Sequence, residues 1–272
     1  MTQPTLAFIG GGNMAASIIG GLIAKGYPAD AITATAPSQA TRDRLAATYK
    51  IATSADNASA AAAAEVVILA VKPQILQTVA EALRPHLAHQ PLVLSIAAGI
   101  PLASLGRWLG ESLTIVRAMP NTPSLVQTGA AGLYATDTAT ASQRALAEQI
   151  LSAVGIATWL DSEADIDAVI AVAGSAPAYF FLMMEAMIDA GVAQGLSREL
   201  ATALTLQTAL GSARLAQQSD VDVAELRRRV MSPGGTTEQA VHSFEADDLR
   251  GIVARAMRRC ADRSAAMAEE MG

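Results

Sequence analysis

Short apolar runs alternate with helix-like segments over roughly the first 160 of the 272 residues. Several runs are apolar throughout, which is typical of parallel strands buried on both faces of a sheet. The predicted strands are Thr5–Ile9, Ala31–Thr35, Glu65–Val71, Pro91–Ile96, Ser112–Met119, Ala130–Thr136 and Ile156–Leu160. Helical patterns lie between them, for example Met14–Lys25 and Ala141–Ala153. This alternation predicts an α/β, Rossmann-like doubly wound sheet.

After Leu160 the pattern changes to long helical segments without strand-like runs. We expect helices over Asp165–Gln194, Arg198–Gln218, Asp222–Val230, Thr237–Glu245 and Asp247–Glu269. Gly195 is the predicted end of the first of them, and Ser197 is the predicted N-cap of the second. We therefore predict a Rossmann domain over residues 1–160 and an all-α domain over residues 161–272.

One helical segment has the composition of a membrane span, because Ala168–Met184 carries no charge. It is interrupted by Gly174, Ser175 and Pro177. It also falls short of the roughly 20 apolar residues that usually span a bilayer. We therefore expect a buried helix pair here and no membrane association.

Composition narrows the class of protein. Hydrophobic residues make up 51% of the chain and charged residues only 16%, which excludes a disordered chain and suggests surface buried between subunits. The formal net charge of −6 argues against a nucleic-acid partner. Cys260 is the only cysteine, so an intramolecular disulfide is excluded. With no targeting segment before the first strand, we expect a cytoplasmic protein.

The first strand leads directly into the sequence "FIGGGNMA", in which Gly10, Gly12 and Ala15 match the dinucleotide pattern G-x-G-x-x-G/A. Gly10 allows the tight turn, Gly12 lets the backbone approach a pyrophosphate, and Ala15 lets the helix pack close to the strand. The pyrophosphate is expected at the helix N-terminus, where free N–H groups favour an anion. A purely structural turn is the alternative.

The end of the second strand favours NADP over NAD. An NAD site usually has an acidic residue there for the ribose 2′-OH, but residues 35–38 contain none. Ser38, with Arg42 or Arg44 behind it, is suited to a 2′-phosphate. The alternative for the arginines is a solvated helix face.

Common catalytic side chains are scarce. There is no metal-ligand spacing, and the only lysines are Lys25, Lys50 and Lys72. Lys72, in "AVKP", is expected at the carboxyl edge of the sheet, where it contacts cofactor or substrate or is simply a surface lysine. The loops "SIAAGI" and "RAMPNTP" follow two further strands at the same edge. The second is either a rigid turn or a wall of the nicotinamide pocket.

The sequence "SPGGTTEQ" predicts a second anion site. Thr236 and Gln239 have the T-x-x-Q spacing of a capping box, so a helix is expected to start at Thr236 after two glycines. Its free N–H groups can bind a carboxylate without a cationic side chain. The alternative is a cap alone, which contributes about 1 kcal/mol.

Taken together, "IGGGNMA", "AVKP", "SIAAGI", "RAMPNTP", "GSAPAYFFLMMEAMIDAGVAQGL" and "SPGGTTEQAV" resemble the pyrroline-5-carboxylate reductase family over nearly the whole chain. The resemblance implies NAD(P)H-dependent hydride transfer to the imine carbon of 1-pyrroline-5-carboxylate, giving L-proline, with NADPH preferred and NADH possible. It also implies a homodimer through the helical domain, assembling further into a ring. Ala176 departs from a glycine frequent in the family, and no contact is carried over to Met231.

The resemblance also assigns site residues. Thr236 is the expected catalytic residue, its hydroxyl facing the ring nitrogen. The expected substrate-binding residues are Gly234, Gly235, Thr236 and Glu163. The expected cofactor-binding residues are Gly10, Gly12, Asn13, Met14, Ser38, Asn57, Ala70, Val71, Lys72, Pro73, Ala97, Ala98 and Gly99. No metal is expected.

A protonated cyclic imine is already electrophilic, so its reduction needs no acid to stabilise an alkoxide. This explains why the helical domain can lack a lysine. Two alternatives stay open. One is another small NADP-dependent imine or β-hydroxyacid reductase, although the latter is expected to need that lysine. The other is a non-catalytic NADP-binding regulator.

Overall fold

The computed structural model describes residues 3–271, which form two compact units. The first comprises residues 3–175 together with 260–271, and the second comprises residues 176–259. The last strand ends at Trp159, and every later element in the described chain is helical. The predicted division at residue 160 therefore marks a change in the type of element. As a division of function it stays a prediction.

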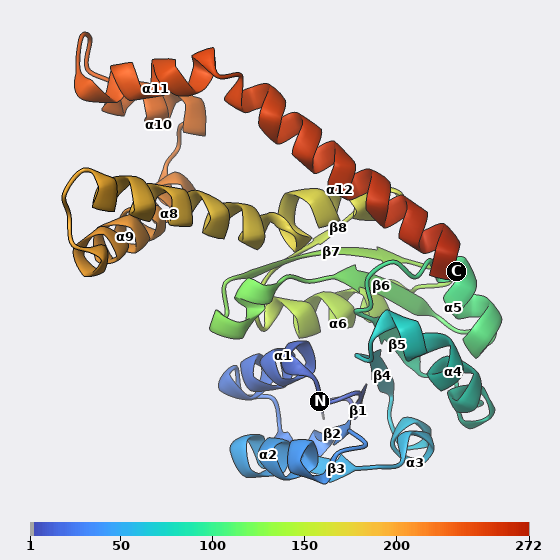
Figure 1. Cartoon of the computed structure of the whole chain (residues 1–272). Helices are drawn as coiled ribbons and strands as arrows, with labels where there is room; N and C mark the ends of the chain where they lie inside the picture. Colours follow the sequence, from blue (N-terminus) through green and yellow to red (C-terminus); the bar gives the residue numbers. More distant parts are fainter. Residues whose placement is uncertain (1–2, 272) are drawn as a thin grey trace. The chain divides into compact units, whose positions relative to one another are not determined.

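The described part of the first unit contains an eight-stranded sheet in the order β3-β2-β1-β4-β5-β6-β7-β8 (Figure 1). The strands are β1 (Leu6–Ile9), β2 (Ile32–Thr35), β3 (Ala52–Ser54), β4 (Val66–Leu69), β5 (Leu92–Ser95), β6 (Ile115–Met119), β7 (Gly129–Ala135) and β8 (Gly155–Trp159). Neighbouring strands are parallel except β6 and β7. All seven predicted strands and the doubly wound fold are confirmed; β3 is an additional strand.

Alternate residues of β1 enter opposite sides of the core. Leu6 and Phe8 pack in a cluster with residues of the helices on one face, and Ala7 and Ile9 pack in a cluster on the other. The first face is covered by α1 (Asn13–Ala24), α2 (Gln39–Tyr49) and α6 (Ala141–Ser152). The second is covered by α3 (Asn57–Ala62), α4 (Pro73–Leu83) and α5 (Leu102–Leu109). Burial on both faces explains why the strands are apolar throughout.

The helical part matches the predicted segments with one correction. Its elements are α7 (Asp165–Val169), a π-helix (Ile170–Gly174), α8 (Ala176–Ala193), α9 (Arg198–Gln218), α10 (Val223–Val230), α11 (Thr236–Ala246) and α12 (Leu249–Met271). The single helix expected over Asp165–Gln194 is wrong, because the Ser175 N–H bonds to Ile170 O at 2.8 Å and widens the turn. The predicted N-cap is confirmed, since Ser197 Oγ accepts from Leu200 N.

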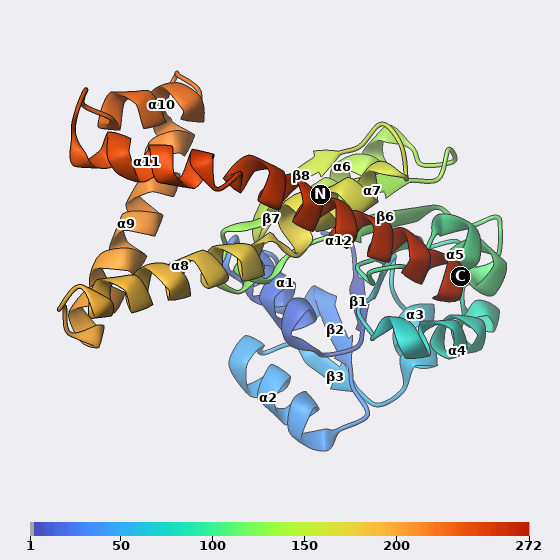
Figure 2. The ribbon, with the colours of Figure 1, turned by 45° about the horizontal axis from the view of Figure 1, so that its top comes forward.

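Within the second unit, α8 and α9 pack against each other (Figure 2). The segment Ala168–Met184 was expected to be buried, but Ala176 is the only buried residue of α8 among those described. The stretch Asp165–Ala193 is long and apolar enough to cross a membrane by length and composition, with 17% of its most apolar window buried. α8 therefore presents a long apolar surface that this chain leaves exposed.

Candidate functional site

The turn after β1 brings three strand ends together. Gly10 adopts φ +108°, and its N–H donates to the buried Thr35 Oγ1 at 3.2 Å. A Cβ on Gly10 would lie 2.7 Å from Ala70 O at the end of β4. Gly10 is thus required by the fold itself. The sequence did not reveal this contact, because a threonine at a strand end carries no distinctive signal.

Gly12 differs from Gly10, because nothing lies within 4 Å of the position its Cβ would take. It is the N-cap of α1 in extended conformation, with φ −72°. The next residues, Asn13 and Met14, have exposed and half-exposed side chains, while Ala15 is 1% exposed against the core. A phosphate can therefore approach the free N–H groups of this helix end, as a dinucleotide requires.

The turn after β2 is shaped by two arginines. Arg42 Nη1 donates to Ala36 O at 2.6 Å and to Pro37 O at 2.8 Å. Arg44 Nη2 donates to Gly11 O at 3.3 Å. The arginines are therefore not merely a solvated helix face. Ser38, the N-cap of α2, makes no side-chain capping bond and keeps its hydroxyl available beside them.

Asn57 begins α3 next to a strongly bonded cap. Asp56 accepts from Ala58 N and Ser59 N, at 2.9 and 3.2 Å. Hydrogen bonds from Ser59, its side chain first, hold the pKa of Asp56 below its usual range. The cap fixes the backbone at Asn57, which is consistent with the expected ribose contact but does not test it.

The expected cofactor residues after β4 and β5 lie at the carboxyl edge of the sheet. Ala70 and Val71 lead to Lys72, the exposed N-cap of α4, and Pro73 is its first residue. The segment 96–101 joins β5 to α5 and contains Ala97, Ala98 and Gly99, whose φ is +75°. Parallel neighbouring strands place these two loops side by side.

The "RAMPNTP" loop is held in place by a buried asparagine. Asn121 is 8% exposed, its Nδ2 donates to Ala173 O at 3.1 Å, and its Oδ1 accepts from Ala130 N at 2.9 Å. Both ends of the amide are therefore used to hold the loop to β7 and the π-helix. The structural alternative accounts for Asn121.

Glu163 lies in the turn before α7, and its Oε1 is already bonded. It accepts from Arg117 Nη1 and from Leu102 N, each at 2.8 Å. Arg117, on β6, is 5% exposed. Sequence reasoning missed this arginine, because its partner lies 46 positions further along the chain.

The "SPGGTT" turn begins a helix where predicted, but the capping box is wrong. Gly235 is the N-cap of α11 and no side chain caps it, so Thr236 is the first helical residue. Glu238, rather than Gln239, reaches back: its Oε2 accepts from Gly234 N at 2.8 Å. The two acceptor side chains are adjacent in sequence, and the spacing alone selects the wrong one.

The N–H groups at the start of α11 differ in whether they are already bonded. Gly234 N–H is bonded to Glu238, and Gly235 N–H donates to Ser232 O at 2.9 Å. The first intrahelical bond of α11 runs from Gln239 N to Gly235 O. The N–H groups of Thr236, Thr237 and Glu238 precede that bond, so they have no partner within the helix.

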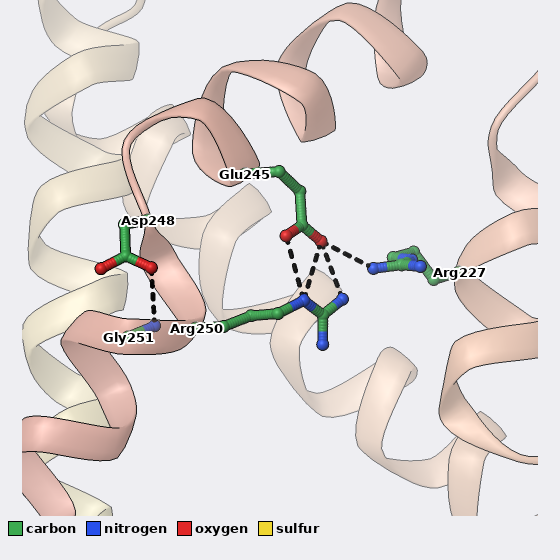
Figure 3. A network of polar contacts seen from close by, with 5 residues as sticks. All are labelled: Arg227, Glu245, Asp248, Arg250 and Gly251. Carbon is green, nitrogen blue, oxygen red and sulfur yellow. Dashed lines mark hydrogen bonds and ion pairs between the residues drawn. The ribbon is translucent and has the colours of Figure 1, made fainter.

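A charged network holds the helices that flank this turn (Figure 3). Glu245, near the end of α11, accepts from Arg227 of α10 at 3.1 Å and from Arg250 of α12 at 2.7 Å. Hydrogen bonds from Arg250 hold the pKa of Glu245 below its usual range. Asp248 Oδ1 accepts from Gly251 N at 3.2 Å in the first turn of α12. Residues on both sides of the Met231–Gly235 turn are thereby linked.

Across residues 3–271, no group of three or more histidine, cysteine, aspartate or glutamate side chains is placed to hold a metal ion.

Comparison with known proteins matches both units. The family described as pyrroline-5-carboxylate reductase dimerisation matches residues 163–267, and the family described as NADP oxidoreductase coenzyme F420-dependent matches residues 5–99. The pyrroline-5-carboxylate reductase of Pseudomonas aeruginosa is 55% identical over 272 residues, which is 100% of both chains. The chain belongs to the pyrroline-5-carboxylate reductase family.

Solved structures of the family have the same fold over nearly the whole chain. The Coxiella burnetii pyrroline-5-carboxylate reductase has a TM-score of 0.94 at 43% identity, covering 97% of this chain and 98% of the other. The Plasmodium falciparum pyrroline carboxylate reductase, whose structure has NADP bound, has a TM-score of 0.87 at 30% identity, covering 98% and 99%. The predicted family and fold are therefore confirmed, and the first unit is a domain of the nicotinamide-dinucleotide type.

Proposed function

We propose that this chain reduces 1-pyrroline-5-carboxylate to L-proline with NADPH, the last step of proline biosynthesis. The observation that carries the proposal is the full-length identity of 55% to a reductase of that name. It is supported by two separate anion-binding helix ends, those of α1 and α11. One suits a pyrophosphate and the other suits a substrate carboxylate.

The coenzyme fits the first unit. The open space at Gly12 and the uncapped start of α1 suit the pyrophosphate, together with Asn13 and Met14. Ser38 lies where a 2′-phosphate is expected, and Asn57 is proposed at a ribose. Residues 70–73 and 97–99 are proposed to line the nicotinamide. When bound, NADPH supplies the hydride.

In the second unit, the N–H groups of Thr236 and Thr237 hold the substrate carboxylate, and the Thr236 hydroxyl bonds the ring nitrogen. Glu238 already bonds Gly234 and so fixes the turn. Because the protonated imine is electrophilic, holding it in place is the main task of these residues. Orientation of this kind can lower a barrier by about 7–11 kcal/mol in favourable cases.

The direct test follows the absorbance of NADPH and NADH with three substrates: pyrroline-5-carboxylate, pyrroline-2-carboxylate and the oxidised form of a 3-hydroxyacid. We expect rapid oxidation of NADPH with the first only. Preference for another substrate would favour a different imine or hydroxyacid reductase. Absence of turnover with all three would favour a non-catalytic NADP-binding regulator.

Thr236→Ala is expected to raise KM for the imine and lower kcat/KM by about 10-fold or more, the order of one hydrogen bond to a charged group. NADPH affinity should not change. Thr237→Ala is the matched control, since consecutive residues of a helix point about 100° apart. Unchanged steady-state kinetics in Thr236→Ala would remove its assigned role, and a loss confined to Thr237→Ala would transfer that role to the neighbour.

Ser38→Asp is expected to shift coenzyme preference from NADPH toward NADH by about 100-fold in the ratio of kcat/KM values, because like charges placed together cost several kcal/mol. The new carboxylate repels a 2′-phosphate and can accept from a ribose 2′-OH. Ser38→Ala removes the hydroxyl without adding charge and is expected to change the ratio much less. An unaltered ratio in Ser38→Asp would place the 2′-phosphate elsewhere.

We also propose a cytoplasmic homodimer formed through the helical region 161–272, which extends to a larger ring. Support comes from the matched dimerisation family and from the exposed apolar surface of α8 and α9. A single cysteine is consistent with a reducing compartment.

A further inference from the structure

Arg117 and Glu163 form an ion pair inside the first unit. The Nη1–Oε1 distance is 2.8 Å, and the side chains are 6% and 28% exposed. Removing two charges from water is costly, and their attraction repays this only with good geometry and further hydrogen bonds. Apolar residues would hold the same elements together at least as well. The pair therefore calls for a reason beyond stability.

The second donor to Glu163 Oε1 supplies that reason. It is the backbone N–H of Leu102, the first residue of α5, at 2.8 Å. Leu102 directly follows the segment 96–101, which we call the β5–α5 loop. The loop begins after Ser95, and Ser95 is the register partner of Arg117 on the neighbouring strand. Glu163 thus contacts the residue that follows the loop, and Arg117 is the strand partner of the residue that precedes it.

Two buried polar atoms of these strand residues are unused. Ser95 Oγ and Arg117 Nη2 are both buried and have no hydrogen-bond partner within the described residues. Paired residues of neighbouring parallel strands project to the same face of the sheet. An unpaired buried donor is costly. If Arg117 and Glu163 served stability alone, we would expect both of these atoms to have partners. Spare donors at this place fit a loop that changes its polar contacts when the coenzyme binds.

We propose that Arg117 and Glu163 are positioning residues that clamp the β5–α5 loop for the nicotinamide end of the coenzyme. Glu163 acts through the Leu102 N–H, and it does not contact the imine. This inference rests on the proposed function, because that function places Ala97 to Gly99 at the nicotinamide. It replaces the expectation that Glu163 binds the substrate.

Two double variants isolate the bond to Leu102 without leaving a buried charge unpaired. Arg117→Met/Glu163→Gln keeps an oxygen acceptor for Leu102 N–H, whereas Arg117→Met/Glu163→Ala does not. We expect the Ala variant to bind NADPH about 10-fold more weakly than the Gln variant, the order of one lost hydrogen bond. Titration calorimetry without the imine gives this ratio. Hydrogen exchange at the Leu102 amide should be faster in the Ala variant.

Equal NADPH affinities in the two double variants would overturn the clamp and leave a structural pair. A change in KM for the imine at saturating NADPH, with NADPH affinity constant, would restore Glu163 as a substrate contact.

The coenzyme measurement stands apart from the proposed reaction. If the unaltered chain fails to reduce the imine, the proposed function is wrong, but the comparison of NADPH affinities still decides whether the loop is clamped.

Discussion

Gly12→Val is expected to weaken NADPH binding by about 100-fold or more while leaving the fold intact, because overpacking by added methyl groups costs about 1–3 kcal/mol or more. The structure has nothing within 4 Å of the added Cβ. The backbone at Gly12, with φ −72°, also suits a branched residue. The side chain would therefore fill only the space that the pyrophosphate needs.

The measurement is calorimetric titration with NADPH, combined with thermal unfolding. Gly106→Val is the matched control. Its Cβ also meets nothing within 4 Å, but it lies in α5 and not in the turn that contains Gly12. Gly106→Val should retain NADPH affinity. Near-normal affinity in Gly12→Val would mean that the pyrophosphate does not approach the backbone at Gly12.

Gly10→Ala, in the same motif, is expected to lower the stability of the fold. Its Cβ would lie 2.7 Å from Ala70 O, and φ is +108°. Strain of this kind costs about 1–3 kcal/mol, so the melting temperature should fall even without coenzyme. The sequence pattern treats the two glycines alike. The structure separates one that the fold requires from one that the ligand requires.

The strands were predictable because a doubly covered parallel sheet needs apolar residues at successive positions, as in Val66–Leu69. The short strand Ala52–Ser54 was not, since its three residues are small or polar and are held by pairing with β2. Apolar periodicity also does not reveal the π-helix Ile170–Gly174, because one widened turn leaves the composition unchanged.

The positions of the candidate site followed from the rule that ligands bind at carboxyl ends of parallel strands, which Gly10 and Ala70 obey. The hydrogen bonds within the site could not be predicted from the sequence. The choice of Glu238 over Gln239 as partner of the turn depends on a one-residue difference in where the helix begins. Arg117 and Glu163 meet only because the sheet and α7 bring them together.

Phe181→Glu is expected to convert the oligomer to monomers. Phe180, Phe181 and Leu182 are 65%, 64% and 65% exposed in one chain. Consecutive helical residues point about 100° apart, so these three present apolar surface around much of α8. Its neighbour α9 covers one side only, and a helix that is apolar all round is normally buried. A second copy of the chain is the occupant that the dimerisation family implies.

In the proposed homodimer, twofold symmetry makes the loss of affinity large. Each subunit contributes the residue once, so one substitution changes the interface twice. Burying a phenylalanine is worth about 1.5–3 kcal/mol, so losing two weakens dimerisation by about 100-fold to 10,000-fold. Placing two unpaired carboxylates in an apolar contact weakens it further. Sedimentation velocity at micromolar protein should therefore show an oligomer before the substitution and a monomer after it.

The control applies the same chemical change to Val126, which is 71% exposed and lies outside the matched dimerisation region. Val126→Glu should leave the oligomer unchanged. If Phe181→Glu also leaves it unchanged, α8 is not the interface. If the original chain is recovered only with membranes, the stretch Asp165–Ala193 is instead a membrane span. The same apolar surface thus has two opposite explanations, a subunit interface and a membrane span. The distribution of the unaltered protein between soluble and membrane fractions, and its mass, distinguish them before any variant is made.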